Sequence, residues 1–409
     1  MTADEARTGA VDLTASSDPR GWLRAGVAVA AVGWGAQQFA PLLLMYQSTL
    51  GLSTTTVQGT FGFYVLGLIP GLLFGGPMSD RYGRRRVMAP TLVVSAVASL
   101  LLILGGTGAG WLFAGRLLAG VASGAAFSSG AAWIKELSAS RSSLSPRRIT
   151  VAMSVGFGLG PLVSGVLAQW GPAPTVVPYL PHLLLAAVAF FLIFGAPETR
   201  FHTGPGSLLG QLRIPEIRDR RFLFVVVPLA PWVFGSVSIA VAYLPGLVKS
   251  SLGDNALIFS TGMTALCAAT GIATQPLARF VDRPGKPWLL GTALGLVVVG
   301  VLVAAAAAAL VQPALAVLAA LILGASYGCC QVCGLREVQR IARPDRLAGL
   351  TAAYQAVSYL GFAASYPLSA AGRHVPAGDL LLIVAALALL TLLWTAYQAS
   401  TDPLRKVRR

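Results

Sequence analysis

Long uncharged stretches dominate the chain, and short charged segments separate them. The stretches without Asp, Glu, Lys or Arg are 25–79, 87–115, 117–134, 149–197, 222–248, 255–278, 287–335, 347–372 and 380–401. A helix crosses a bilayer with about 20 mostly apolar residues, so the three longest stretches, of 49 to 55 residues, each accommodate two spans and the others one. The alternation typical of a β-barrel is absent. The pattern therefore predicts an all-α membrane protein with 12 transmembrane helices.

Turn-forming residues stand where the long stretches must divide. The first stretch is expected to turn at 48–53, the second at 169–174 and the third at Gln312-Pro313. Four residues, 105–108, separate the third and fourth spans without any charge.

The charge distribution predicts the topology. Of 409 residues, 55% are hydrophobic and only 11% charged, against about 25% charged in a soluble domain, which excludes a disordered chain or an ordinary soluble enzyme. Of the 30 basic residues, 27 fall in the tails and in loops on one side of the predicted topology. The positive-inside rule places that side, and both termini, in the cytoplasm. The net charge of +15 then faces anionic lipid rather than nucleic acid.

The chain reads as two related halves. The segment 80–84 is echoed by 282–286, and two glycines (120 and 124) are echoed at 324 and 328, with offsets of 202 to 204 residues. Such repeats predict two pseudo-symmetric six-helix bundles. The expected units are a cytoplasmic N-terminal tail (1–22), an N-terminal bundle (23–197), a cytoplasmic linker (198–221), a C-terminal bundle (222–399) and a basic cytoplasmic tail (400–409).

Several motifs resemble those of the major facilitator superfamily. The segment 76–86, G-P-M-S-D-R-Y-G-R-R-R, is similar to that family's signature after the second span. Arg116-x3-Gly120-x3-Gly124 is similar to its second motif, and Pro197-Glu198-Thr199-Arg200 also fits. A span-five motif associated with exporters is matched by Gly156, Gly160, Pro161 and Gly165, which are expected to serve helix packing. The resemblance implies a small-molecule transporter with that family's fold.

The signature segment suggests a conformational latch at the cytoplasmic end. The Asp80 carboxylate can meet basic side chains or the positive N-terminus of a neighbouring helix, and Gly76 would let that helix approach. Pairs that exist in only one state bias the equilibrium between states. The alternative is that these arginines only fix the topology. The latch candidates are Gly76, Asp80, Arg81, Gly83, Arg84, Glu136, Asp282 and Arg283, with Arg147, Arg148, Glu337 and Arg340 as further partners.

Arg116 is the one charged residue expected inside a span. It either contacts substrate or pairs with backbone carbonyls as a structural arginine, and both interpretations stay open here. No carboxylate lies in the middle of a span, which argues against a proton relay through a buried acid. Glu136, Glu337 and His182 are the nearest titratable alternatives, and a coupling proton stays among the expected partners.

The resemblance implies that spans 1, 4, 7 and 10 line a central cavity. Mid-depth polar and aromatic residues there, and in span 11, are the substrate-binding candidates, with helix–helix packing as the alternative for each. They are Trp34, Gln37, Gln38, Arg116, Ser123, Phe127, Trp232, Ser236, Tyr327, Gln331, Tyr354, Gln355 and Tyr359. Rings and amides without a counter-charge suit an amphipathic neutral or weakly anionic solute.

The function predicted is alternating-access transport of a small organic solute, as an exporter of drug-like or secondary-metabolite compounds. The alternative is uptake of a small polar or anionic solute, with Arg116 contacting the anion. We expect a monomer in a bacterial cytoplasmic (inner) membrane. We expect no enzyme activity, cofactor, metal or nucleic-acid partner, because no constellation of ligands or of nucleophile and base is present, and the C-x-x-C at Cys330 lies within a span.

Overall fold

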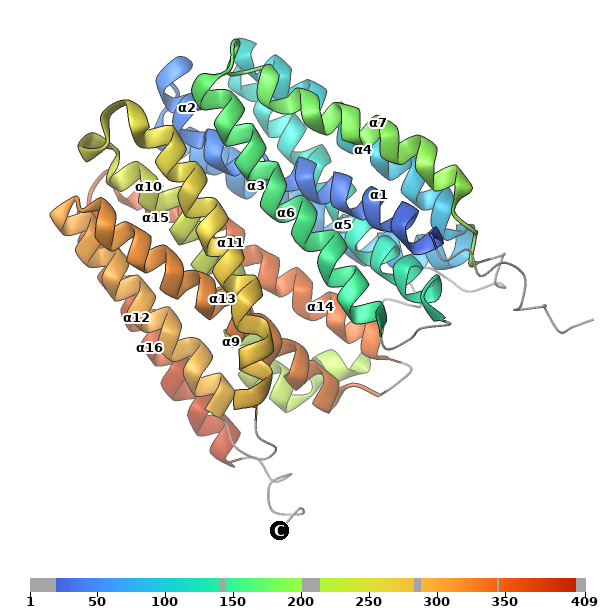
Figure 1. Ribbon diagram of the computed structural model, residues 1–409. Helices are drawn as coiled ribbons and strands as arrows, with labels where there is room; N and C mark the ends of the chain where they lie inside the picture. Colours follow the sequence, from blue (N-terminus) through green and yellow to red (C-terminus); the bar gives the residue numbers. More distant parts are fainter. Residues whose placement is uncertain (1–19, 140–143, 201–213, 283–287, 344–345, 402–409) are drawn as a thin grey trace, which may run out of the picture.

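The computed structural model describes residues 20–139, 144–200, 214–282, 288–343 and 346–401, and these residues form helices and no strand. Figure 1 shows two bundles side by side, one built from α1 to α7 and the other from α9 to α16. We call them the N-terminal half (21–195) and the C-terminal half (222–401). The all-helical fold predicted from the sequence is confirmed.

The N-terminal half is a bundle of long helices in chain order. Its elements are α1 (Gly21–Gln37), η1 (Ala40–Leu42), α2 (Leu43–Thr49), α3 (Thr54–Tyr82), α4 (Arg84–Leu104), η2 (Gly105–Thr107), α5 (Ala109–Glu136), α6 (Ser145–Trp170), η4 (Val177–Tyr179), α7 (Leu180–Leu192) and η5 (Ile193–Gly195). The predicted turns at 48–53, 105–108 and 169–174 coincide with helix ends.

The C-terminal half follows the short turn η6 (Pro215–Arg218). Its elements are η7 (Phe222–Val226), α9 (Val227–Ser238), η8 (Ile239–Tyr243), α10 (Leu244–Leu247), η9 (Lys249–Ser251), η10 (Gly253–Asn255), α11 (Ala256–Val281), α12 (Trp288–Leu310), α13 (Pro313–Ile341), α14 (Leu347–Tyr359), η11 (Leu360–Ala364), α15 (Ser365–Ala371) and α16 (Ala377–Thr401).

Eleven helices in the described ranges are long and apolar enough to cross a membrane, against the twelve expected. The remaining predicted span, 347–372, is helical over most of its length, but as α14, η11 and α15 in succession. Polar side chains lower its hydropathy, among them Gln355, Ser358 and Ser365. All three of these elements contact α3 of the N-terminal half. The polar composition of the span therefore reflects burial inside the protein rather than contact with lipid.

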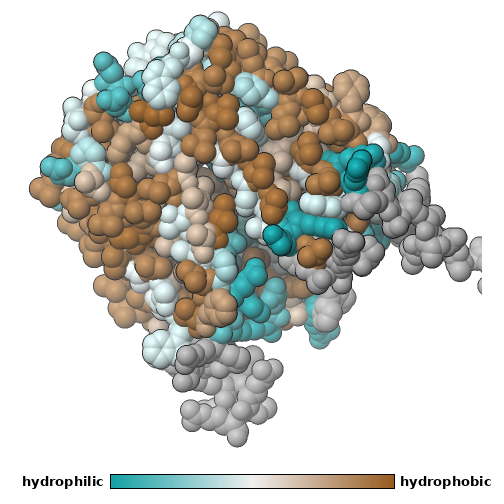
Figure 2. Space-filling model, viewed as in Figure 1, coloured by the Kyte–Doolittle hydropathy of each residue, from teal (hydrophilic) through white to brown (hydrophobic). Residues whose placement is uncertain are grey.

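The outer surface divides into an apolar belt and a basic end. Large apolar side chains such as Phe191 and Leu390 are exposed. Figure 2 shows apolar residues over most of the visible face, with hydrophilic residues towards both ends and larger groups of them at the lower right. That end carries the segments 81–86, 135–139, 144–148, 196–200, 214–221, 279–282 and 336–343, and we call it the basic end. The opposite end, with the turns near 50, 106, 173, 250 and 311, is the far end.

Glycines bring α3 and α5 into backbone contact. A Cβ atom at Gly120 would overlap the carbonyl oxygen of Tyr64, and one at Gly124 would overlap that of Leu68. The C-terminal half repeats this contact between α11 and α13, where a Cβ at Gly324 or Gly328 would overlap α11 backbone. The paired glycines seen in the sequence therefore serve close helix packing, because a residue without a side chain lets the backbones of two membrane helices approach each other.

Replacing Gly120 with alanine is expected to destabilise the fold, because the added methyl group must push α3 and α5 apart. Overpacking of this kind costs about 1–3 kcal/mol, which should lower the melting temperature of the detergent-solubilised protein, measured by size exclusion after heating. Gly158→Ala is the matched control, since a Cβ there meets no atom within 4 Å. Equal melting temperatures for the two variants would contradict the packing role.

Candidate functional site

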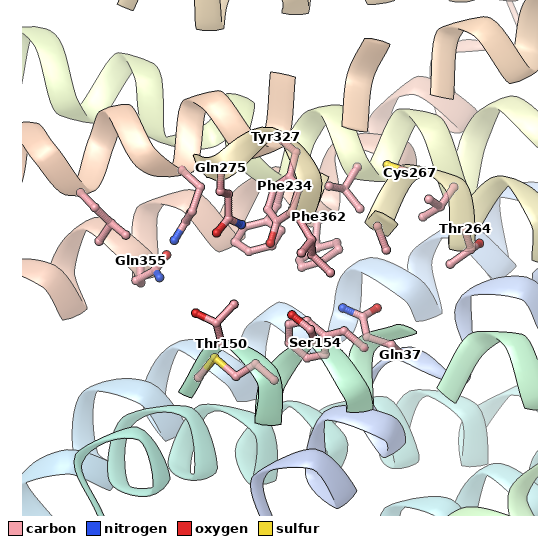
Figure 3. A pocket seen from close by; sticks show the side chains of 18 of the residues that line it. Gln37, Thr150, Ser154, Phe234, Thr264, Cys267, Gln275, Tyr327, Gln355 and Phe362 are labelled. Atoms are coloured by element: carbon pink, nitrogen blue, oxygen red, sulfur yellow. The ribbon is translucent and has the colours of Figure 1, made fainter. Parts of the chain in front are cut away.

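A cavity of about 310 Å³ lies between the two halves. Figure 3 shows Gln37, Thr150 and Ser154 on its N-terminal side, facing aromatic and amide side chains of the C-terminal half. The lining residues are Gln37, Ile149, Thr150, Met153, Ser154, Phe157, Phe234, Val237, Val241, Thr264, Cys267, Ala268, Ile272, Gln275, Arg279, Tyr327, Gln331, Leu335, Gln355 and Phe362.

Helix α6 supplies most of the N-terminal wall. Its lining residues, Thr150, Met153, Ser154 and Phe157, recur at the spacing of one helix face. A different face carries Gly156 and Gly160 of the span-five motif, where added Cβ atoms would meet the α1 backbone. The third motif glycine, Gly165, faces the other half, and a Cβ there would meet Thr261 of α11. Gly156 and Gly160 thus allow α6 to pack closely on α1, and Gly165 allows it to pack closely on α11.

The C-terminal wall is an aromatic cluster centred on Phe234. Its ring stacks on Tyr359, with centroids 4.4 Å apart, and on Phe362, at 4.6 Å. Tyr327 packs against the same ring at 5.5 Å, tilted by 41°. These rings offer a broad apolar surface on which a flat ligand can stack.

Four glutamines place amide groups around this apolar surface: Gln37 on α1, Gln275 on α11, Gln331 on α13 and Gln355 on α14. The Oε1 atoms of Gln331 and Gln355 are buried and have no hydrogen-bond partner. A buried acceptor left unpaired costs about 1–3 kcal/mol, so both positions favour a bound group that donates a hydrogen bond.

Of the predicted substrate-binding residues, the cavity is lined by Gln37, Tyr327, Gln331 and Gln355. Two others contact aromatic rings that line the cavity. The ring of Phe127 packs on that of Phe157, with centroids 5.3 Å apart, and the ring of Tyr359 packs on that of Phe234. The α5 helix, predicted to line the cavity as span 4, supplies no lining residue. Its glycine face packs on α3 instead.

The remaining predicted residues make contacts elsewhere. Trp232 donates to Thr391, Ser236 to the Trp232 carbonyl and Ser123 to the Ala119 carbonyl. Tyr354 donates to the Cys330 carbonyl, and Trp34 lies against the α6 glycines. For these residues the packing alternative describes the observed geometry.

Gln38 belongs to a buried polar network, one position away from the cavity-lining Gln37. Its Nε2 donates to Ser99 Oγ, which lies 2.8 Å from His182 Nδ1. The second ring nitrogen of His182 is 3.2 Å from Ser95 Oγ. Since α1 ends at Gln37, the network joins α4 and α7 to the break in the first span.

Arg116 lies in a closed aromatic box, not among the residues that line the cavity. Its guanidinium donates to the carbonyl oxygens of Ala36 and Phe61, at 3.0 and 3.4 Å. Three rings surround it, with Tyr64 at 4.4 Å, Phe39 at 4.9 Å and Phe61 at 5.7 Å from the guanidinium carbon. The structural interpretation therefore describes the contacts of Arg116 in this conformation. Because Arg116 does not line the cavity here, its contact with an anion stays a prediction.

The predicted latch residues of the N-terminal half meet at the basic end. Arg84 pairs with Asp80 at 2.5 Å and with Glu136 at 2.8 Å. Glu136 also pairs with Arg200 at 3.1 Å and accepts a hydrogen bond from Thr199. The contacts predicted for Asp80, Arg84 and Glu136 are thus present, while their role in gating stays a prediction.

Gly83 and Glu198 explain why α3 and α4 turn so sharply. Gly83 has a φ of 105°, which favours glycine. The carboxylate of Glu198 lies against it and accepts hydrogen bonds from the backbone N–H groups of Arg84 and Arg85, at 2.8 and 3.0 Å. This N-terminal cap of α4 was not assigned to Glu198 from the sequence.

Four other latch candidates are placed differently than expected. The close approach between α3 and α5 occurs at Gly75, whereas a Cβ at Gly76 would make only an ordinary 3.7 Å contact with Ser128. Arg81 lies over the Tyr82 ring. Arg148 donates to Ser138 and lies over Trp22, and Arg147 is exposed.

The C-terminal half carries the related cluster. Asp282 pairs with Arg340 at 2.8 Å and with Arg336 at 3.6 Å. Glu337 pairs with Arg340 and Arg221, both at 2.5 Å. Arg283 lies outside the described residues. In this conformation, the ion pairs named for the two clusters each connect residues of one half or its adjoining linker, so they do not hold the halves together.

The halves meet instead at the far end. Gln58 of α3 donates to the Ala242 carbonyl at 2.6 Å, and the hydroxyls of Thr55 and Ser369 lie 3.4 Å apart. Phe61 packs edge-on against Phe362, with centroids 5.6 Å apart. The cavity lining, in contrast, reaches the exposed residues Thr150 and Arg279 at the basic end. The cavity is therefore closed at the far end and accessible from the basic end.

A sequence model of the Major Facilitator Superfamily matches residues 25–366. The chain belongs to this superfamily. Its members are transporters rather than enzymes, in agreement with the class of protein predicted from the sequence.

Individual relatives are distant. A chloramphenicol resistance protein of Pseudomonas aeruginosa is 26% identical over 65% of this chain and 63% of its own length. Member 10 of the facilitated glucose transporters of Mus musculus is 28% identical over 61% of the chain and 50% of its length. The matches thus span one half to two thirds of these relatives.

Solved structures show the same fold at lower identity. A POT family transporter in complex with a thioalcohol-conjugated peptide has a TM-score of 0.74 and 12% identity, covering 91% of this chain and 95% of that one. This similarity confirms the fold predicted from the sequence and carries no information about the substrate.

Proposed function

We propose that the protein exports small, neutral organic compounds by alternating access, with the basic end in the cytoplasm. The observation that carries the proposal is the cavity between the halves, open at the basic end and closed at the far end by contacts from α3 to η8, η11 and α15. Opening the far-end contacts while closing the basic end would carry a bound compound across the membrane.

The relatives support export, and the cavity chemistry supports the class of solute. A chloramphenicol resistance protein and a multi-drug resistance efflux pump homologue of Lactococcus lactis are among the similar proteins. Aromatic rings combined with uncharged amides suit amphipathic solutes better than sugars, which need many paired polar groups.

The proposal is tested with radiolabelled chloramphenicol in bacterial cells that lack their own exporters. Cells producing the protein should accumulate less label than cells with an empty vector, and inside-out vesicles from them should take up more. Higher accumulation in the producing cells than in the empty-vector cells would favour uptake. If the two kinds of cell accumulate equal amounts of chloramphenicol, and likewise of other neutral aromatic compounds, export would be contradicted.

The latch is tested separately with Asp80→Asn. Because Asp80 pairs with Arg84 and lies 3.9 Å from Arg200, its loss should shift the balance between conformations and slow transport about tenfold for each 1.4 kcal/mol of shift. Folding should be unaffected, since the Asp80 side chain is 43% exposed. Asp254→Asn at the far end is the control. Unchanged transport in Asp80→Asn would contradict a role of Asp80 in a latch.

A further inference from the structure

We propose that Arg279 makes the cavity selective by charge, so that it admits neutral and anionic compounds that donate hydrogen bonds and repels organic cations. This inference rests on the proposed transport function and specifies its substrate class. It assigns a specificity role to a residue that lies outside the family motifs and outside the predicted binding set.

Arg279 is the charged end of a strip along α11. Thr264, Ala268, Ile272, Gln275 and Arg279 recur every three or four residues, and all of them line the cavity. They therefore share one face of the helix. Along this face, the residues deep in the cavity are uncharged, Gln275 follows with an amide, and the exposed guanidinium of Arg279 lies at the basic end.

The positive charge of Arg279 is not compensated by the described residues. The cavity lining includes no Asp or Glu, and within the described ranges the Arg279 guanidinium forms neither an ion pair nor a hydrogen bond. The nearest acid along the chain, Asp282, is already paired with Arg336 and Arg340, and Glu337 with Arg340 and Arg221. A solute entering from the basic end therefore meets a net positive field.

The deeper cavity adds a requirement for hydrogen-bond donors. The unpaired Oε1 atoms of Gln331 and Gln355 are acceptors, and no carboxylate stands beside them to stabilise a cation. A neutral hydroxyl or amide N–H would pair with them while an aromatic group stacks on Phe234 and Phe362. The combination fits a flat compound with hydroxyl or amide groups, either uncharged or carrying an anionic group towards Arg279.

The charge selectivity is measured without any substrate. Ser154, on the opposite wall, is changed to cysteine in a variant whose four native cysteines are serine. The rates of modification by anionic sulfonatoethyl methanethiosulfonate and cationic trimethylammonioethyl methanethiosulfonate are then compared in inside-out vesicles. Adding Arg279→Gln should lower the anion-to-cation rate ratio about three- to tenfold, and Arg279→Glu should lower it further.

Arg343→Gln is the matched control, because Arg343 is an exposed arginine of the same half and basic end that does not line the cavity. It should leave the ratio within about twofold, as screening by salt predicts for a charge outside the cavity. Equal ratios for Arg279→Gln, Arg343→Gln and the parent would overturn the proposal.

A transport assay separates this proposal from the proposed function. Cells producing the protein should export chloramphenicol, which is neutral and carries hydroxyl and amide donors, but not ethidium, a permanent cation. Export of both compounds would overturn the charge selectivity and leave the transport function intact. Export of neither, with the thiol rate ratio still dependent on Arg279, would contradict the proposed function alone.

Discussion

Transport should stop when Thr55 and Ser369 are both replaced by cysteine and oxidised to a disulfide. Their hydroxyl oxygens are 3.4 Å apart across the far-end contact between α3 and α15, and a disulfide needs Cβ atoms about 3.5–4.5 Å apart. The bond would hold the far end closed, so we expect transport to fall at least about tenfold under oxidising conditions and to recover after reduction.

A control disulfide at the same end should not have this effect. Ser53 and Thr56 have hydroxyls 2.8 Å apart and both lie at the start of α3, so a disulfide between them joins no two elements of different halves. Both pairs are introduced into the variant without native cysteines, and transport is measured before and after dithiothreitol. Full transport through the oxidised Thr55–Ser369 pair would show that the far end does not need to open.

Arg116→Ala should destabilise the protein severely. The substitution removes the donors to the Ala36 and Phe61 carbonyls and leaves a void between Phe39, Phe61 and Tyr64. Unpaired buried carbonyls and a large void together cost roughly 3–5 kcal/mol. We expect a melting temperature lower by about 10 °C or more, or a loss of folded protein.

Arg116→Lys separates the structural role from substrate contact. Lysine keeps the charge and one strong donor, so it should recover part of the lost stability. Ligand binding to the folded fraction of the Arg116→Lys variant is measured as the thermal shift that chloramphenicol causes. A normal melting temperature for Arg116→Ala combined with lost binding would contradict the structural role and restore the predicted substrate contact.

Interactions at the helix ends could be predicted from the sequence, because charged side chains are excluded from the lipid and therefore pair with one another at the helix ends. Asp80, Arg84 and Glu136 lie at the ends of three helices joined by short turns, and the structure brings them into contact. The cap formed by Glu198 could have been anticipated in the same way, since an acid next to a sharp glycine turn commonly finds the free N–H groups of the following helix.

The cavity lining was predicted only in part, because hydropathy does not define how a membrane helix is rotated. Gln37 and Gln38 are neighbours of the same type, yet one lines the cavity and the other bonds to Ser99. A helix that contacts lipid on one side and protein on the other is apolar on both sides. Its hydropathy pattern therefore does not show which side faces the protein. On α6, the spacing of Thr150, Ser154 and Phe157 indicated a face that could line the cavity. Gly156 and Gly160 lie on a different face, which packs on α1.

The direct test of the account is the side from which the cavity is reached. Ser154→Cys in the variant without native cysteines is exposed to a membrane-impermeant maleimide in inside-out and right-side-out bacterial vesicles. A cavity open at a cytoplasmic basic end predicts rapid labelling in inside-out vesicles, slowed by chloramphenicol, and little labelling in right-side-out ones. Faster labelling from the outer side would contradict both the orientation and the open end on which the proposed transport cycle depends.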